Sequence, residues 1–184
     1  MSRVDTVALV GLPGSGKTNL ARALGELLGW EVIDLDDYLQ MRSGRTIAEL
    51  FQSGEECFRQ WEHRCLAQVV GRKRCVIATG GGVVERADNR DLLNQVFTVF
   101  LDVSVPEAQR RTAKSNHRPL LKGGGDRLAA LAERRLPWYR QVADVTVEVD
   151  DAPKHVNFSR LQQALTEAGV ITGIDRGEDE DTGR

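Results

Sequence analysis

The sequence predicts a single α/β domain with a mainly parallel sheet. Two observations lead to this fold class. Short β-branched runs alternate with longer amphipathic stretches, which is the pattern of strand–helix–strand units. The chain has 184 residues, of which 41% are hydrophobic and 28% charged, so it is long enough to bury a core of its own. We therefore expect one domain over residues 1–172, in which helices flank the sheet.

Five short apolar runs are the candidate strands. The run 6–10 leads into a glycine-rich segment, 31–34 ends in a group of aspartates, and 75–78 is followed by three glycines. The run 96–101 is rich in Val and Phe, and 145–149 alternates Val with polar residues. Apolar runs of this length that end at turn signals are typical of strands.

Seven amphipathic stretches are the candidate helices. The clearest start lies near residue 106, because Ser104 and Glu107 form a capping-box pattern and Pro106 stands just inside the helix. The expected helices are 17–28, 36–42, 47–52, 56–70, 106–111, 127–139 and 153–168.

Two segments break the alternation. Residues 113–125 are polar, contain Pro and Gly, and form a longer connection than is usual, so we expect a mobile lid there. Residues 173–184 carry five acidic residues against two basic ones and are expected to be a disordered tail.

Composition excludes several classes of protein. With 25 basic and 27 acidic residues the formal net charge is −2, which does not favour nucleic-acid binding. The three cysteines form no C-x-x-C pair, so neither a zinc site nor a disulfide framework is expected. No apolar run reaches the ~20 residues of a membrane helix, and no signal peptide is evident. A cytoplasmic protein with free thiols is expected.

The segment from Gly11 to Thr18 (GLPGSGKT) fits the phosphate-binding pattern G-x-x-x-x-G-K-[ST] without a mismatch. It also stands between a predicted strand and a predicted helix, as that motif requires. Backbone N–H groups of such a loop converge on phosphates, with the positive end of the helix dipole behind them. Lys17 would reach the β- and γ-phosphates, and the Thr18 hydroxyl would bind Mg²⁺. The motif predicts binding of a nucleoside triphosphate.

The reaction class follows from what the rest of the chain lacks and contains. The D-x-x-G switch and the N-K-x-D guanine reader of a GTPase are absent, and a motor would need more chain. A small kinase is therefore favoured. Its acceptor site is expected near Asp34 and Asp36, which end the second strand and alternate onto the same side. One carboxylate would serve the Mg²⁺ shell and the other a substrate hydroxyl, whereas Asp37 is expected to cap a helix.

An arginine and a run of three glycines complete the predicted acceptor site. Arg59 can offer a two-pronged contact to a carboxylate, and Glu62 lies three residues later on the same helix face, where the two can pair. Gly80, Gly81 and Gly82 follow the third strand and would let a ligand approach the backbone closely.

Further arginines stand near the predicted lid. Arg118 lies within it and could be carried toward the transferring phosphoryl group. Arg111 precedes the lid and could stack on adenine. Arg135 follows it and could bind a carboxylate, whereas its neighbour Arg134 is expected to face solvent.

These motifs together resemble the shikimate kinase family. The P-loop is followed in order by D-x-D, G-E-x-x-F-R-x-x-E, G-G-G, R-P-L-L and R-x-P-x-Y-x-x-x-A-D. The resemblance covers about residues 6–168. It implies a five-stranded parallel sheet of the nucleoside-monophosphate-kinase type, with a lid and a helical substrate-binding region. It also implies transfer of the γ-phosphoryl group of ATP to the 3-hydroxyl of shikimate, with Mg²⁺.

The resemblance implies a role for each matching residue. Lys17 and Arg118 would stabilise the phosphoryl group, and Asp36 would be the base. Arg111 and Pro153 would flank adenine. The remaining nucleotide-binding positions would be Gly14, Ser15, Gly16, Thr18 and Asn19. Shikimate would contact Asp36, Arg59, Gly80, Gly81, Gly82, Arg135, Phe51 and Phe58, and Asp34 would reach the metal through water.

The sequence departs from the family pattern at two positions, and two alternative functions are left open. Asn19 replaces the usual Ser or Thr, and Trp138 replaces the common Leu of P-L-Y. A kinase of another polyhydroxy acid such as gluconate would share the P-loop, and a non-catalytic nucleotide-binding regulator would share the fold. ATP and the acceptor are the only expected partners, and the chain is expected to be a monomer.

Overall fold

The computed structural model describes residues 5–113 and 125–171. Its centre is a five-stranded parallel sheet with the strand order β2-β3-β1-β4-β5. The strands are β1 (Thr6–Val10), β2 (Glu31–Asp34), β3 (Cys75–Ala78), β4 (Phe97–Val103) and β5 (Val145–Val149).

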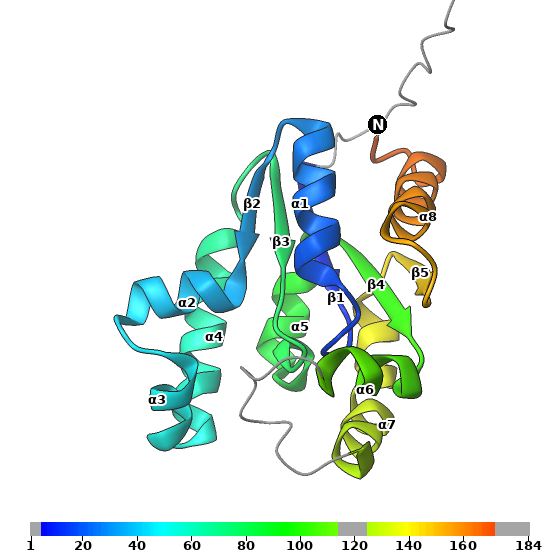
Figure 1. Ribbon diagram of the computed structural model, residues 1–184. Helices are drawn as coiled ribbons and strands as arrows, with labels where there is room; N and C mark the ends of the chain where they lie inside the picture. The colour runs from blue at the N-terminus through cyan, green and yellow to red at the C-terminus, as the bar shows by residue number, and fades with distance from the viewer. Residues whose placement is uncertain (1–4, 114–124, 172–184) are drawn as a thin grey trace, which may run out of the picture.

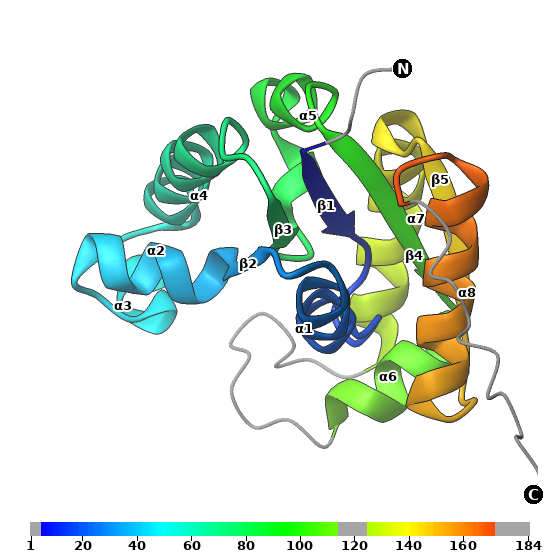
Figure 2. The same ribbon diagram turned by 90° about the horizontal axis from the view of Figure 1, so that it is seen from above.

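Helices surround this sheet (Figure 1). They are α1 (Lys17–Leu28), α2 (Leu35–Ser43), α3 (Ile47–Gln52), α4 (Glu55–Val69), α5 (Ala87–Leu93), α6 (Val105–Ala113), α7 (Gly125–Val142) and α8 (Lys154–Glu167), with a short 3-10 turn η1 (Val83–Glu85). Figure 2 shows α1 and α5 on opposite sides of the sheet, and α2, α3 and α4 grouped beyond the β2 edge. The molecule therefore has three layers and a helical extension at one edge.

The burial pattern explains why the strands lie where they do. Every residue of β1 and of β3 is buried, as expected for parallel strands covered on both faces. The edge strand β5 instead alternates, with Val147 and Val149 buried. In α1 the residues Leu20, Ala21 and Leu24 face the core, which is the spacing of one helix face.

The register brings the carboxyl ends of the strands together. Ala78 of β3 pairs with Leu9 of β1 and with Asp34 of β2, and Leu9 also pairs with Val99 of β4. In an open parallel sheet this edge is where ligands bind. The loops that follow β1, β2 and β3 therefore meet at one place.

The five predicted strands and seven predicted helices are confirmed to within a few residues. The prediction missed α5 and η1, because the segment from Val83 to Leu93 is short and has many charges. The assignment of Asp37 as a helix cap is wrong. Asp34 caps α2, since its side chain accepts from the N–H groups of Asp36 and Asp37, and Asp37 lies in the first turn.

Two predicted segments lie mainly or wholly outside the described residues. Of the expected lid, only its ends are described, with Ala113 closing α6 and Gly125 opening α7. The acidic segment 173–184 is not described. Within 5–113 and 125–171, none of the helices combines the length and hydrophobicity that a membrane span requires.

Candidate functional site

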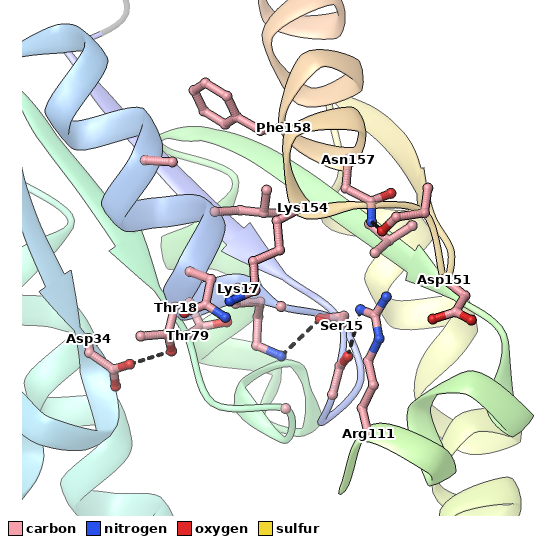
Figure 3. Close-up of a pocket in the computed structure, with 18 of the residues that line it drawn as sticks. Ser15, Lys17, Thr18, Asp34, Thr79, Arg111, Asp151, Lys154, Asn157 and Phe158 are labelled. Atoms are coloured by element: carbon pink, nitrogen blue, oxygen red, sulfur yellow. Dashed lines mark hydrogen bonds between the residues drawn. The ribbon is translucent and has the colours of Figure 1, made fainter.

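A cavity of about 680 Å³ opens at the carboxyl edge of the sheet. Its floor is the loop between β1 and α1, and one end is formed by Asp34, Asp36, Gly80 and Gly81. The other end is formed by α6 and by the start of α8 (Figure 3). The cavity therefore extends from the predicted acceptor residues, across the predicted phosphate loop, to the predicted adenine site.

The phosphate loop has the geometry its sequence predicts. Gly16 is the N-cap of α1 with φ 89° and ψ 15°, a left-handed conformation that glycine adopts without strain. Lys17 is nearly buried, and its Nζ donates to the carbonyl oxygens of Gly11 at 2.8 Å and Leu12 at 2.9 Å. The amine is thus folded over the loop, at the start of a helix whose N-terminus carries partial positive charge.

Thr18 and Asp34 form an oxygen pair between the loop and β2. The Thr18 hydroxyl donates to Asp34 Oδ2 at 2.6 Å, and Asp34 Oδ1 accepts from the N–H of Asp36 at 3.1 Å (Figure 3). In the described part of the chain, no three His, Cys, Asp or Glu residues gather as metal ligands. A hydroxyl and a carboxylate nevertheless suit Mg²⁺, which keeps several waters and binds substrate phosphates with few protein ligands.

The opposite end of the cavity is made by α6 and α8. Arg111 donates to the carbonyl oxygen of Gly14 at 3.2 Å and is also held by Glu107 and the Asp150 carbonyl. Pro153, which caps α8, lines the same end. The structure thus brings together Arg111 and Pro153 as expected.

Sequence reasoning missed three further residues at this end. Lys154, Asn157 and Phe158 project from α8 along the cavity (Figure 3). Only their position in the first turns of a helix after Pro153 could have indicated this. The predicted nucleotide-binding positions Gly14, Ser15, Gly16, Lys17, Thr18 and Asn19 all line the cavity.

Carboxylates converge on the first glycine after β3. A Cβ atom at Gly80 would lie 3.0 Å from Asp36 Oδ1 and 3.0 Å from Glu62 Oε1. A side chain at this position would therefore require both carboxylates to shift by a few tenths of an ångström. Arg59 is beside them, with its Nη1 donating to Glu62 Oε2 at 2.7 Å, so the predicted pair of Arg59 and Glu62 is confirmed.

Two polar atoms of this cluster lack partners among the described residues. They are Arg59 Nε and Glu62 Oε1, and both are buried. An unsatisfied buried polar group is costly and is rare in folded proteins, which makes these two atoms candidates for ligand contact. Burial raises the pKa of Glu62 to about 7, although the charge of Arg59 opposes the shift.

The second predicted carboxylate-binding arginine lies close by. Arg135 is buried, and its Nε donates to Glu85 Oε1 at 2.7 Å. Arg134 is exposed, as predicted, and its Nη2 reaches the same oxygen at 2.6 Å. Glu85 Oε2 lies 3.8 Å from Arg59 Nη2. Glu85, which sequence reasoning missed, therefore stands between the two arginines.

Close packing holds the glycine turn after β3 and the two stacked phenylalanine rings in place. A Cβ atom on Gly82 would lie 2.7 Å from Arg59 Cζ, so the guanidinium packs directly on the backbone. The Tyr139 hydroxyl donates to the carbonyl oxygen of Gly81. Phe51 and Phe58 stack with ring centroids 4.4 Å apart on the α3–α4 side. Tyr139 was part of a recognised motif, but the motif gave it no role.

Arg118 lies outside the described residues, so its predicted position is untested. The remaining predicted residues form two groups at the same edge of the sheet. One group would bind the phosphates and the nucleoside, and the other consists mainly of carboxylates and arginines. Such an arrangement can hold a nucleoside triphosphate against an acidic, hydroxylated acceptor.

The fold and the cavity define a P-loop kinase that acts on a small molecule. A family model described as Shikimate kinase matches residues 13–166. The chain therefore belongs to the shikimate kinase family.

Similar proteins agree with this assignment. The chain is 41% identical over 156 residues to a shikimate kinase from Marinomonas sp. (strain MWYL1), covering 82% of this chain and 86% of the relative. It is 42% identical over 162 residues to one from Synechococcus elongatus, covering 85% and 84% of the two chains. A solved structure of shikimate kinase from Acinetobacter baumannii in complex with shikimate has a TM-score of 0.86 and 34% identity, covering 91% of this chain and 96% of that one.

Proposed function

We propose that this protein transfers the γ-phosphoryl group of ATP to the 3-hydroxyl of shikimate. One observation carries the proposal beyond the family: two buried, unpartnered atoms, Arg59 Nε and Glu62 Oε1, lie in the carboxylate and arginine cluster beside the phosphate loop. Glu62 Oε1 lies against Gly80, which lines the cavity with Asp36, so the pair would stand directly behind a ligand that carries carboxylate and hydroxyl groups. A gluconate-type kinase and a silent regulator are not favoured by the family match or by the intact Lys17 and Asp36.

The phosphate loop would bind the triphosphate of ATP. Its backbone N–H groups and the N-terminus of α1 attract the β- and γ-phosphates. Lys17 Nζ would exchange the loop carbonyls for phosphate oxygens, since an ammonium binds an anion more strongly than a neutral carbonyl. Arg111 and Pro153 would lie against adenine. We also assign Arg118 to the transferring phosphoryl group on the family pattern.

Thr18 and Asp34 would hold Mg²⁺, the hydroxyl directly and the carboxylate through water. The ion would neutralise phosphate charge as the phosphoryl group moves. The Thr18 hydroxyl oxygen and Asp34 Oδ2 are already 2.6 Å apart, so little rearrangement is needed for both to face the same ion.

Asp36 would receive the proton of the acceptor hydroxyl. The acceptor oxygen forms a bond to the γ-phosphorus, the bond from that phosphorus to the β–γ bridging oxygen breaks, and ADP leaves. The hydroxyl proton passes to Asp36 Oδ1, which faces Gly80. Arg59 and Arg135 would hold the acceptor's carboxylate, and Phe51 and Phe58 would cover the ring.

Release of ADP from Mg-ATP by the purified protein tests the proposal, with shikimate, gluconate and quinate compared in parallel. Stimulation by shikimate above both other acids is expected. Equal rates with all three acids, or no stimulation at all, would overturn it. We also infer a cytoplasmic monomer, and size-exclusion chromatography with light scattering tests the oligomeric state.

A further inference from the structure

Glu85 lies between the two arginines that the proposed function assigns to the carboxylate of the substrate. Its Oε1 accepts from Arg135 Nε at 2.7 Å and lies 2.6 Å from Arg135 Nη2. Its Oε2 lies 3.8 Å from Arg59 Nη2. One carboxylate therefore hydrogen-bonds Arg135 of α7 and lies within ion-pair distance of Arg59 of α4.

The contact with Arg135 fixes the plane of its guanidinium. A carboxylate oxygen that accepts from both Nε and Nη2 holds one edge of the guanidinium and leaves the group little freedom to rotate. Both arginines are nearly buried, with side chains 3% and 6% exposed, so water does not compete strongly for them. Their orientation is thus set before a ligand enters.

Glu85 is shared among several guanidinium groups. Its Oε1 is shared with the exposed Arg134 at 2.6 Å, so three guanidinium groups surround one carboxylate. The arginines hold the pKa of Glu85 below its ordinary value despite its burial. Arg59 is also paired with Glu62 at 2.7 Å and Glu55 at 3.4 Å, so the positive charge that can attract a second carboxylate lies on Arg134 and Arg135, which share Glu85.

The backbone of Glu85 is itself held by two helices. Arg90 of α5 donates to the carbonyl oxygens of Val84 at 2.7 Å and Glu85 at 3.3 Å. The same guanidinium lies over the ring of Trp138 in α7, 5.0 Å from its centroid. The indole thus supports the arginine that fixes η1.

We propose that Glu85 is a positioning residue that orients Arg135, beside Arg59, toward the carboxylate of the acceptor and so sets the preference for an acidic substrate. The inference rests on the proposed function. Glu85 acts through the arginines and need not touch the substrate.

Glu85→Gln tests this role, because it keeps the shape of the side chain and removes its charge. We expect KM for the acid to rise about tenfold, with kcat changed less than about threefold, because the clamp acts on the ground state and the transition state alike. KM for ATP should stay unchanged. Glu55→Gln is the matched control, since Glu55 contacts Arg59 at 3.4 Å but is 57% exposed, whereas Glu85 is 16% exposed and pairs with both arginines.

The methyl ester of shikimate separates positioning from a general loss of structure. Its dissociation constant, measured by calorimetry, should be the same in the wild-type protein and in Glu85→Gln, because it lacks the charge that the arginines bind. The inference would be overturned if the variant lost affinity for the acid and the ester to the same extent, or if KM for the acid were unchanged or lower. If the Gln variant does not fold, Glu85→Asp takes its place, with the same expected contrast between acid and ester.

The proposed function and this inference fail in different ways. If the wild-type protein does not bind shikimate, the proposed function is wrong. If it binds shikimate and Glu85→Gln binds it equally well, only the role of Glu85 is wrong.

Discussion

At the scale of single residues, two aspartates separated by one position have different tasks. Asp34 caps α2 and accepts from Thr18, whereas Asp36 faces Gly80 and Glu62. Alternation along the chain placed both at the same end of the sheet. It could not divide their tasks, because that division depends on which one begins the helix.

Asp36→Asn should lower kcat by about 10²–10⁴-fold, the usual contribution of a general base, while the affinity for ATP stays the same. Steady-state kinetics with both substrates measure this. Asp37→Asn is the control, since Asp37 lies in the same helical turn but is exposed. A kcat of Asp36→Asn that equals that of Asp37→Asn would remove Asp36 from the chemistry.

Arg59→Ala should raise KM for shikimate roughly 10- to 100-fold, the range expected for loss of a charged hydrogen bond, with a smaller effect on kcat. Arg64→Ala serves for comparison, because Arg64 is on the same helix and lies exposed over Trp61. If both variants kept the wild-type KM, Arg59 would have no part in binding the acceptor.

Glu62 should make stability depend on pH. Its pKa is about 7 in the folded chain against 4.5 ordinarily, so the folded state holds the proton that the unfolded state has lost between these values. The free energy of unfolding of the wild type relative to Glu62→Gln should therefore fall as pH rises from 4.5 to 7, and level off above. Urea unfolding at a series of pH values measures this difference. A difference that stayed constant or rose with pH would contradict it.

At the scale of elements, α7 is coupled to the glycine turn after β3. Tyr139 is fully buried, stacks on Phe100 with centroids 5.2 Å apart, and donates to the carbonyl oxygen of Gly81. The helix that carries Arg135 is thereby fixed to the turn that contacts Asp36 and Arg59.

Tyr139→Phe should reduce the free energy of unfolding by about 1–2 kcal/mol, because it removes the hydroxyl that donates to the Gly81 carbonyl. Chemical denaturation measures the change. Tyr38→Phe is the control, since the Tyr38 hydroxyl meets Gln68 at 3.0 Å on the exposed side of the domain, and it should cost much less. If both variants lost the same free energy of unfolding, the contact with Gly81 would contribute no more to stability than an exposed hydrogen bond.

At the scale of the whole molecule, the strand order and the cavity follow from local signals that agree with one another. The glycine loop, the aspartates and the glycine run each end a strand, and parallel register brings those ends to one edge. This is why the meeting of these three segments at one edge could be predicted from the sequence.

The residues that the sequence did not reveal are those whose roles depend on tertiary contacts. Glu85 lies in a short 3-10 turn with no periodic signal, yet it joins arginines from two helices. Lys154 and Phe158 look like ordinary helix residues until α8 packs beside the phosphate loop. The unpartnered oxygen of Glu62 likewise appears only when its surroundings are known.

The central claim, transfer of the γ-phosphoryl group to the 3-hydroxyl of shikimate, is tested most directly by determining the structure of the product. Phosphorus and proton NMR of the mixture of ATP, Mg²⁺ and shikimate after reaction locate the transferred phosphate. The proposed function predicts one phosphate ester per ADP, on the 3-oxygen of shikimate. An ester at another hydroxyl, or inorganic phosphate in place of an ester, would contradict it.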